Sequence, residues 1–224
     1  MIRNNRNKRL RKRKLSLKDT RIRAGLAILA VLTVILAVRS CASGSRRNLD
    51  VDASEPEIDV QLLDVNAYSR PGINTDTITG IVIHYTANPG STAQENRDYF
   101  NSLQYTQETE ASSNFVIGLD GEIIQCVPTW EVAYASNERN MDTVSIECCH
   151  PDDSGAFTDE TYRSLVQLTA WLCEKFDLNQ DDVIRHYDVT GKICPKYFVD
   201  HEDEWTEFKA NVGKAMERSA EEAE

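Results

Sequence analysis

Hydrophobic and polar positions along this chain follow two spacings, one typical of strands and one typical of helices. The apolar, largely β-branched run GIVIHYT at 80–86 predicts a buried strand. TVSIECC at 143–149 predicts a second strand, and 183–186 a short third one. Between these last two, apolar residues recur every three or four positions up to Phe176. This spacing predicts an amphipathic helix, which Thr158 can cap.

The remaining elements follow from turn and cap signals. Asp120-Gly121 lies between two apolar segments and predicts a hairpin, because Asp-Gly favours the tight turn. Ser91-Thr92-Ala93-Gln94 has the form of a capping box, so a helix should follow it. We expect hairpin strands at 114–118 and 122–127, an end to that helix near Leu103, and a last helix at 203–216.

Strands interleaved with helices predict the α/β class. The expected architecture is a single domain with a central mixed β-sheet flanked by helices, preceded by one transmembrane helix. The domain should span 68–216, followed by a charged C-terminal tail at 217–224. A polar, acidic segment at 41–67 has little periodicity and is expected to form a stalk or linker.

Charge is distributed unevenly, and this bears on location. The chain of 224 residues has a net charge of −11, yet residues 1–23 carry eleven Lys or Arg and one acid. An uncharged, mostly apolar segment of fifteen residues, 24–38, follows between Arg23 and Arg39. As a helix it spans roughly 22 Å, short of a ~30 Å hydrocarbon core, but flanking arginines can snorkel. A transmembrane signal anchor over 24–40 is therefore expected.

The cations set the orientation of this anchor. They predict a basic cytoplasmic tail at 1–23 and place everything after the anchor outside the cell. The expected location is the cell membrane, with secretion after signal cleavage as the alternative, because the apolar length also suits a signal peptide. A nucleic-acid-binding role for the basic run is not favoured, since an apolar segment follows it at once. No nucleic-acid partner is expected.

Six cysteines in an exported chain permit disulfides without requiring them. Cys41 lies at the expected membrane edge. No spacing dictates how the others pair, so bridges and free thiols both remain open. The four with no other expected role are Cys126, Cys148, Cys149 and Cys173.

The densest candidate chemistry lies in HYDVTGKICP at 186–195. It brings the imidazole of His186, the ammonium of Lys192 and the thiol of Cys194 within nine residues. Imidazole and thiolate are characteristic zinc ligands. His84, in the strand at 80–86, can supply a third ligand. Two His and one Cys with an open fourth position match a catalytic rather than a structural zinc site.

Glu147 is a carboxylate between apolar neighbours in its expected strand, and burying it without a partner would be costly. A cleft beside a metal would account for its position. Each of these residues alone is common in ordinary protein cores and surfaces, and only their combination favours a site. His150 could line the same cleft, whereas His201 lies in an acidic loop and should be solvated.

With these residues in view, the segment from Tyr68 to Val212 resembles the zinc-dependent N-acetylmuramoyl-L-alanine amidases of the type-2 amidase family. That family includes amidase-type phage lysozymes and peptidoglycan recognition proteins. The matching segments are 80–86, NFVIG at 114–118, DGEIIQ at 120–125, VSIE at 144–147 and 186–195. The resemblance implies that His84, His186 and Cys194 bind Zn²⁺ and that Glu147 and Lys192 are catalytic.

The implied reaction is hydrolysis of the amide bond between N-acetylmuramic acid and L-alanine in bacterial peptidoglycan. Glu147 would act as the base, and Lys192 would stabilise the developing oxyanion. Ser113 stands roughly where some members have a catalytic Tyr, which favours Glu147 in that role. Asn114 and Ala135 also depart from the family pattern and leave the substrate contacts open.

Two other functions fit the same residues. One is a non-catalytic peptidoglycan-binding receptor on this fold, although loss of the metal ligands is the usual route to that state and all three are present. The other is a purely structural metal site, which needs a fourth protein ligand. Cys149 or His150 would have to supply it.

Overall fold

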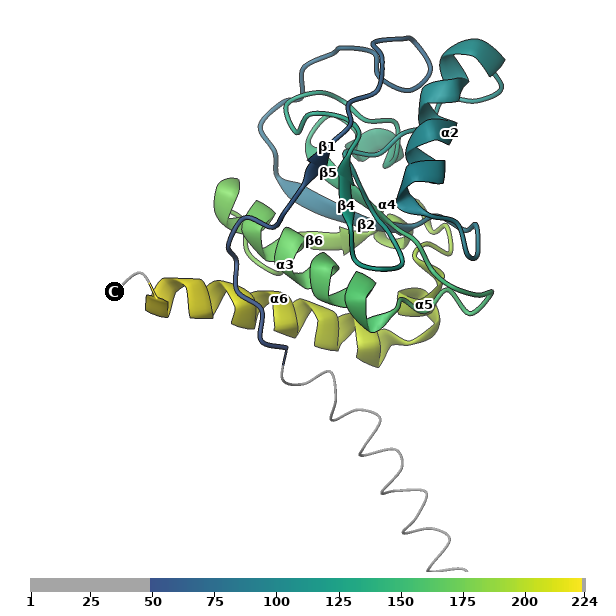
Figure 1. The fold of residues 1–224 in the computed structure, drawn as a ribbon. Helices are drawn as coiled ribbons and strands as arrows, with labels where there is room; N and C mark the ends of the chain where they lie inside the picture. Colours follow the sequence, from purple (N-terminus) through teal and green to yellow (C-terminus); the bar gives the residue numbers. More distant parts are fainter. Residues whose placement is uncertain (1–48, 223–224) are drawn as a thin grey trace, which may run out of the picture. The chain divides into compact units, whose positions relative to one another are not determined.

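Six strands form one mixed sheet in the order β1-β4-β3-β5-β2-β6 (Figure 1). The computed structural model describes residues 49–222. The strands are β1 (Asp59–Val60), β2 (Gly80–Tyr85), β3 (Phe115–Ile117), β4 (Ile123–Gln125), β5 (Thr143–Cys148) and β6 (Val183–Arg185). The helices are α2 (Ala93–Thr106), α3 (Asp159–Lys175), α4 (His186–Thr190), α5 (Lys196–Asp200) and α6 (Glu202–Glu222), with a 3₁₀ turn, η1, at Asn137–Arg139.

The centre of the sheet is parallel and its edge is mixed. β2 pairs in parallel with both β5 and β6, and β3 pairs in parallel with β5. β4 is antiparallel to β3, and β1 is parallel to β4. Parallel strands covered on both faces are continuously apolar, which is why Ile81, Val82 and Ile83 are all fully buried. The predicted mixed sheet flanked by helices is confirmed.

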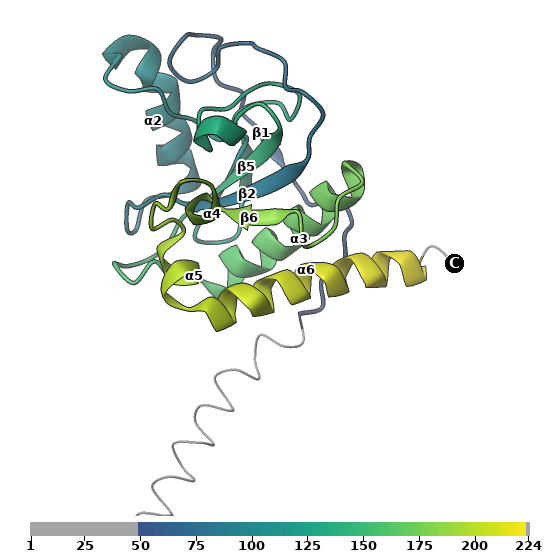
Figure 2. The same cartoon turned by 180° about the vertical axis from the view of Figure 1, so that it is seen from behind.

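Helices cover both faces of this sheet. Figures 1 and 2 show α3 and α6 side by side on one face and α2 on the other. Phe100 and Leu103 of α2 pack on Val116 and Ile124 of the hairpin strands. On the other face, an aromatic cluster with Phe198 and Phe208 at its centre joins α5 to α6. The unit from Asp50 onward therefore has its own core, and residues 45–224 are expected to fold independently.

Turn and capping signals in the sequence predicted the positions of most elements to within a few residues. The hairpin is confirmed, with Ile117 opposite Ile123 and Gly121 at φ +84° in the turn. Thr158 caps α3 as expected, its side chain accepting from the Thr161 amide. The capping box of α2 is one residue later than predicted, because Thr92 and Glu95 form it rather than Ser91 and Gln94.

The stalk predicted at 41–67 needs correction for its described part, because these residues pack on the domain. β1 extends the sheet by pairing with β4, and Leu63 is 1% exposed. Val51 and Ala53 are buried near the end of α6, where Arg218 donates to the Val51 carbonyl and Ser219 Oγ accepts from the Ala53 amide. The acidic composition concealed this, since the contacts are made mainly by backbone groups and a few apolar side chains.

The charged tail predicted from residue 217 also continues as helix, because α6 extends to Glu222 rather than ending near Met216. The basic tail and the anchor predicted at 1–23 and 24–40 lie outside the described residues. Within 49–222, no helix is both long enough and apolar enough to cross a membrane. The five cysteines of this range are buried free thiols, so bridges are not formed there.

The N-terminal segment can be tested by mutation. Leu63→Ala should lower the free energy of unfolding of residues 45–224 by about 2–5 kcal/mol, as large-to-small core changes do. Val60→Ala is the matched control, because that side chain is 60% exposed on β1, and it should change stability by less than about 0.5 kcal/mol. Urea unfolding measures both. Equal, negligible effects would show that this segment does not pack on the domain.

Candidate metal centre and cleft

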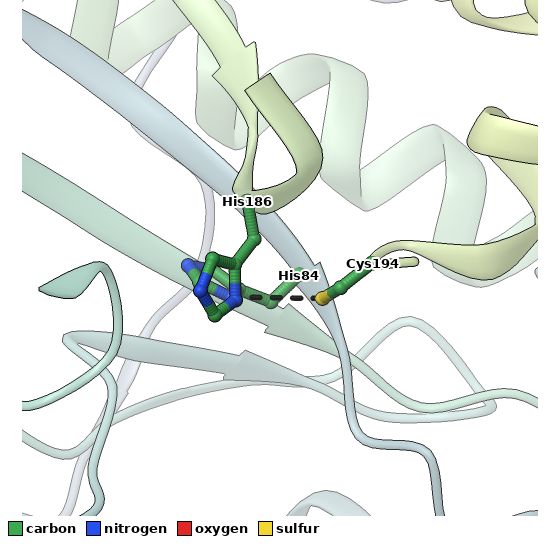
Figure 3. A group of neighbouring side chains, drawn as sticks. All are labelled: His84, His186 and Cys194. Atoms are coloured by element: carbon green, nitrogen blue, oxygen red, sulfur yellow. Dashed lines mark hydrogen bonds between the residues drawn. The ribbon is translucent and has the colours of Figure 1, made fainter. Parts of the chain in front are cut away.

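Three side chains from distant parts of the sequence converge at one end of the sheet. His84 lies near the end of β2, His186 is the first residue of α4, and Cys194 precedes α5. Figure 3 shows the three side chains directed toward one another. One ligand atom from each lies within 4.8 Å of the other two. The structure therefore brings together all three residues that the sequence suggested as ligands.

The pairing of β2 explains this convergence. β2 lies between β5 and β6, and the β2–β5 register places His84 beside Glu147. His84 Nδ1 is 4.0 Å from Glu147 Oε1. The chain leaves β6 directly into His186, and the two imidazole centroids are 4.7 Å apart. The cluster thus forms where adjacent parallel strands end, the usual position of ligand sites in α/β sheets.

Hydrogen bonds fix the loop that carries Cys194. The Tyr187 amide donates to the Cys194 carbonyl at 2.9 Å, which closes the loop behind His186. Gly191 bends the chain at φ +79°, a conformation that glycine adopts without strain. Cys194 Sγ then lies 3.8 Å from His84 Nδ1.

The start of α4 is held by a buried arginine. The Arg185 guanidinium bonds Asp188 and Glu202 and donates to the Phe198 carbonyl. Asp188 also accepts from the Arg185 amide at 2.8 Å. These contacts tie His186, the next residue, to the elements that follow it.

The electrostatics of the cluster suit a bound cation. Burial, together with the nearby His186 and Lys192, holds the pKa of His84 well below its usual value. Burial and Lys192 also lower the pKa of His186. Both rings are therefore neutral near pH 7, the form that binds metal. Burial raises the pKa of the Cys194 thiol to about 12, so a cation must displace its proton on binding.

An unpartnered atom supports the fit of a metal to this cluster. His186 Nδ1 is buried and has no hydrogen-bond partner within the described part of the chain. Buried polar atoms normally have a partner, and a metal ion bound by this cluster would supply one. Two imidazole nitrogens and a thiolate also suit a borderline-soft divalent ion.

The second nitrogen of each ring contacts one loop that the sequence patterns did not single out. His84 Nε2 is 3.2 Å from Ser136 Oγ, and His186 Nε2 is 2.9 Å from Asn137 Oδ1. These two residues belong to no recognisable motif, so no local signal pointed to them.

A cleft of about 420 Å³ opens over the cluster. Glu147 lies at its base with a side chain that is 17% exposed, and Lys192 lines the wall. Loss of solvation raises the pKa of Glu147 to about 8, against the lowering effect of Lys192. The other lining residues are Phe100, Thr109, Glu110, Ala111, Ser112, Tyr134, Ala135, Asn137 and Asn140, together with His84 and His186.

Ser113 and Asn114, which depart from the family pattern, have structural contacts. Ser113 and Asn114 are buried, and both bond Ser145 of β5. Asn114 also donates to the Pro128 carbonyl. Ala135, in contrast, does line the cleft.

The remaining candidates lie outside the cluster. His150 stacks on Tyr85 and its Nδ1 contacts the Asp152 carbonyl, whereas Cys149 Sγ accepts from Asn96. His201 is exposed and packs on Tyr197. The potential metal-binding group found within 49–222 contains only His84, His186 and Cys194. Neither proposed fourth ligand joins it, so a closed structural site is not formed.

Comparisons with known proteins agree with this geometry. The family described as N-acetylmuramoyl-L-alanine amidase (Amidase_2) matches residues 74–197. CwlL of Bacillus licheniformis, an N-acetylmuramoyl-L-alanine amidase, is 36% identical over 164 residues, covering 68% of this chain and 45% of CwlL. The amidase BlyA of Bacillus subtilis (strain 168) is 32% identical over 173 residues, covering 68% of this chain and 46% of BlyA. The chain thus spans about half the length of these relatives.

The solved structure of PlyL has the same fold. It superposes with a TM-score of 0.62 at 21% identity, covering 71% of this chain and 99% of PlyL.

Metal binding by this cluster can be tested with two cysteine variants. Residues 45–224 should bind one divalent transition-metal ion, and Cys194→Ala should weaken binding by more than about 100-fold, because loss of a ligand exceeds the effect of losing an outer contact. Cys173→Ala is the control, since Cys173 is an equally buried free thiol on α3. Competition with a chromophoric chelator measures the affinities. Equal binding by both variants would contradict the assignment.

Proposed function

The chain belongs to the family of N-acetylmuramoyl-L-alanine amidases, and from this premise we propose that it hydrolyses the amide bond between N-acetylmuramic acid and L-alanine in bacterial peptidoglycan. One observation carries the proposal. His84, His186 and Cys194 form a buried cluster at the base of an open cleft, and Glu147 and Lys192 line the same cleft. This arrangement brings candidate metal ligands, a carboxylate and an ammonium group to one cleft, and these are the kinds of group that metal-assisted amide hydrolysis uses.

We propose Zn²⁺ as the ion. Two histidines and one cysteine are a ligand set that zinc accepts in catalytic sites, where three protein ligands leave one position open. When bound, zinc supplies Lewis-acid chemistry that polarises the scissile carbonyl and activates water near neutral pH.

Glu147 is proposed as the general base. Its carboxylate lies 4.0 Å from a ring nitrogen of the cluster and faces the cleft. It can accept a proton from the attacking water and deliver it to the leaving amino group of L-alanine. The carboxylate must be ionised to do so, and nearby positive charge favours that form. Lys192 contributes such a charge, since it lowers the pKa of Glu147.

Lys192 is proposed to stabilise the negative charge that develops on the carbonyl oxygen. It lies two residues before Cys194 and lines the wall of the cleft. Its amide donates to Thr190 Oγ1 at 3.3 Å, which links its backbone to the end of α4. An ammonium group beside a developing oxyanion stabilises it electrostatically.

We further propose that residues 24–40 anchor the chain in the cell membrane, with 1–23 in the cytoplasm and the domain outside. The eleven cations of residues 1–23 and the apolar segment after them support this. The enzyme would then act on wall material next to the membrane.

Cell fractionation tests the anchor. A full chain with a C-terminal tag should remain in the membrane fraction after high-salt washing, and external protease should remove the tagged domain from spheroplasts. An intact tagged domain in the medium, shorter than the full chain, would instead show a cleaved signal peptide.

The proposed reaction is tested with purified sacculi and residues 45–224. Glu147→Gln should lower the rate about 100- to 10 000-fold, the usual contribution of a general base. Lys192→Ala should lower it about 100- to 1000-fold, as loss of one oxyanion donor does. Both variants should retain zinc. Muropeptide analysis should reveal free peptides with an N-terminal L-alanine.

Glu174→Gln is the control for these variants, because Glu174 is exposed on α3 and should leave the rate unchanged. Full activity of Glu147→Gln and Lys192→Ala would refute the two roles. Binding to sacculi without peptide release by the zinc-loaded wild type would favour a peptidoglycan-binding receptor.

A further inference from the structure

We propose that Ser136 and Asn137 are positioning residues that fix the ring tautomers of His84 and His186, so that both Nδ1 atoms present lone pairs to one metal ion. The inference rests on the proposed metal site and not on the amide reaction. It assigns a role to a loop that contributes no ligand of its own.

The contact at His186 favours one tautomer of its ring. Asn137 Oδ1 lies 2.9 Å from His186 Nε2, and a carbonyl oxygen can only accept a hydrogen bond. With Oδ1 facing the ring, this contact favours the tautomer that carries its hydrogen on Nε2. A neutral imidazole has one N–H, so the lone pair belongs to Nδ1. That atom is buried and has no partner among the described residues. Since Nε2 contacts Asn137, Nδ1 is the ring nitrogen left to serve as the ligand atom of His186.

The contact at His84 has the same geometry. Its Nε2 lies 3.2 Å from Ser136 Oγ, and each residue is only 1% exposed. The other ring nitrogen, Nδ1, faces Cys194 Sγ at 3.8 Å. A hydroxyl oxygen can accept from Nε2–H, which leaves the Nδ1 lone pair directed at the cluster. Each ring thus has its outer nitrogen on the loop and its inner nitrogen on the site.

Hydrogen bonds within the loop hold both groups in place. Asn140 Oδ1 accepts from the Ala135 and Ser136 amides at 3.1 and 2.6 Å. The Arg139 amide donates to the Ser136 carbonyl at 3.0 Å, and the Asn140 amide to the Asn137 carbonyl at 3.1 Å. Asn137 itself has φ +53°, a left-handed conformation that asparagine tolerates better than most residues.

The wrong tautomer would point an N–H at the metal. Groups that hold the outer nitrogen of a ligating histidine fix both its tautomer and its ring orientation, and losing one typically lowers metal affinity 10- to 100-fold. The loop contacts both histidines, and both would bind the same ion. Changes at Ser136 or at Asn137 should therefore weaken binding of that one ion.

Three variants of residues 45–224 test this. Asn137→Gly removes the acceptor while allowing the left-handed backbone, and Ser136→Ala removes the hydroxyl with little change in volume. Each should bind Zn²⁺ about 10- to 100-fold more weakly in chelator competition. Asn137→Asp keeps an acceptor oxygen at the same place, so it should lose less than about 10-fold in affinity, below the range for a lost outer contact.

Nitrogen NMR of the zinc-free protein gives a readout independent of activity. In the wild type, both His84 and His186 should carry hydrogen on Nε2. In Asn137→Gly, His186 should become a mixture of tautomers while His84 stays unchanged. The reverse should hold for Ser136→Ala.

Asp177→Gly is the matched control, because Asp177 is an exposed residue with φ +56° in the turn after α3. It should change neither zinc affinity nor the ring spectra. Wild-type affinity in both Asn137→Gly and Ser136→Ala, or hydrogen on Nδ1 of either ring in the wild type, would overturn the inference while leaving the metal site intact. A wild type that binds no zinc would overturn this inference and the proposed metal site together.

Discussion

The parallel pairing of β2 with β5 and β6 is the constraint on which the site depends. Its register sets His84 beside Glu147, and the exit of β6 supplies His186. A shift by one residue would send His84 to the opposite face, because strand side chains alternate. The apolar residues of β2 are fully buried between the helical layers, so a shift would also disrupt their close packing. Core packing and site geometry are therefore determined by the same six residues.

The sequence predicted the parts of the structure that are encoded locally. Continuous apolar runs identified β2 and β5, Asp-Gly identified the hairpin, and Thr158 identified the start of α3. The three candidate ligands could be chosen from residue chemistry, because two histidines and a cysteine next to apolar strands are together typical of a metal site. Glu147 was found for a related reason, as a carboxylate in an otherwise apolar strand.

Elements that depend on distant contacts could not be predicted in this way. β1 has two residues, both exposed, and exists only because β4 offers a free edge. α4 and α5 have five residues each, and α4 is held by the contacts of Arg185 rather than by helix propensity. Ser136 and Asn137 contact ring nitrogens 52 and 49 residues away, so nothing near them in the sequence marks their position.

Burying the polar groups of the cluster costs free energy, and these unfavourable groups are gathered at one site. His186 Nδ1 and Glu147 Oε2 are buried without partners in the described residues, and burial works against the charged forms of His84, Glu147 and Cys194. In a structural core such groups would be replaced by apolar ones or by satisfied pairs. Here they lie together under an open cleft, at the ends of the central parallel strands. Perturbed groups concentrated in one cleft are characteristic of a site for binding or catalysis rather than for stability.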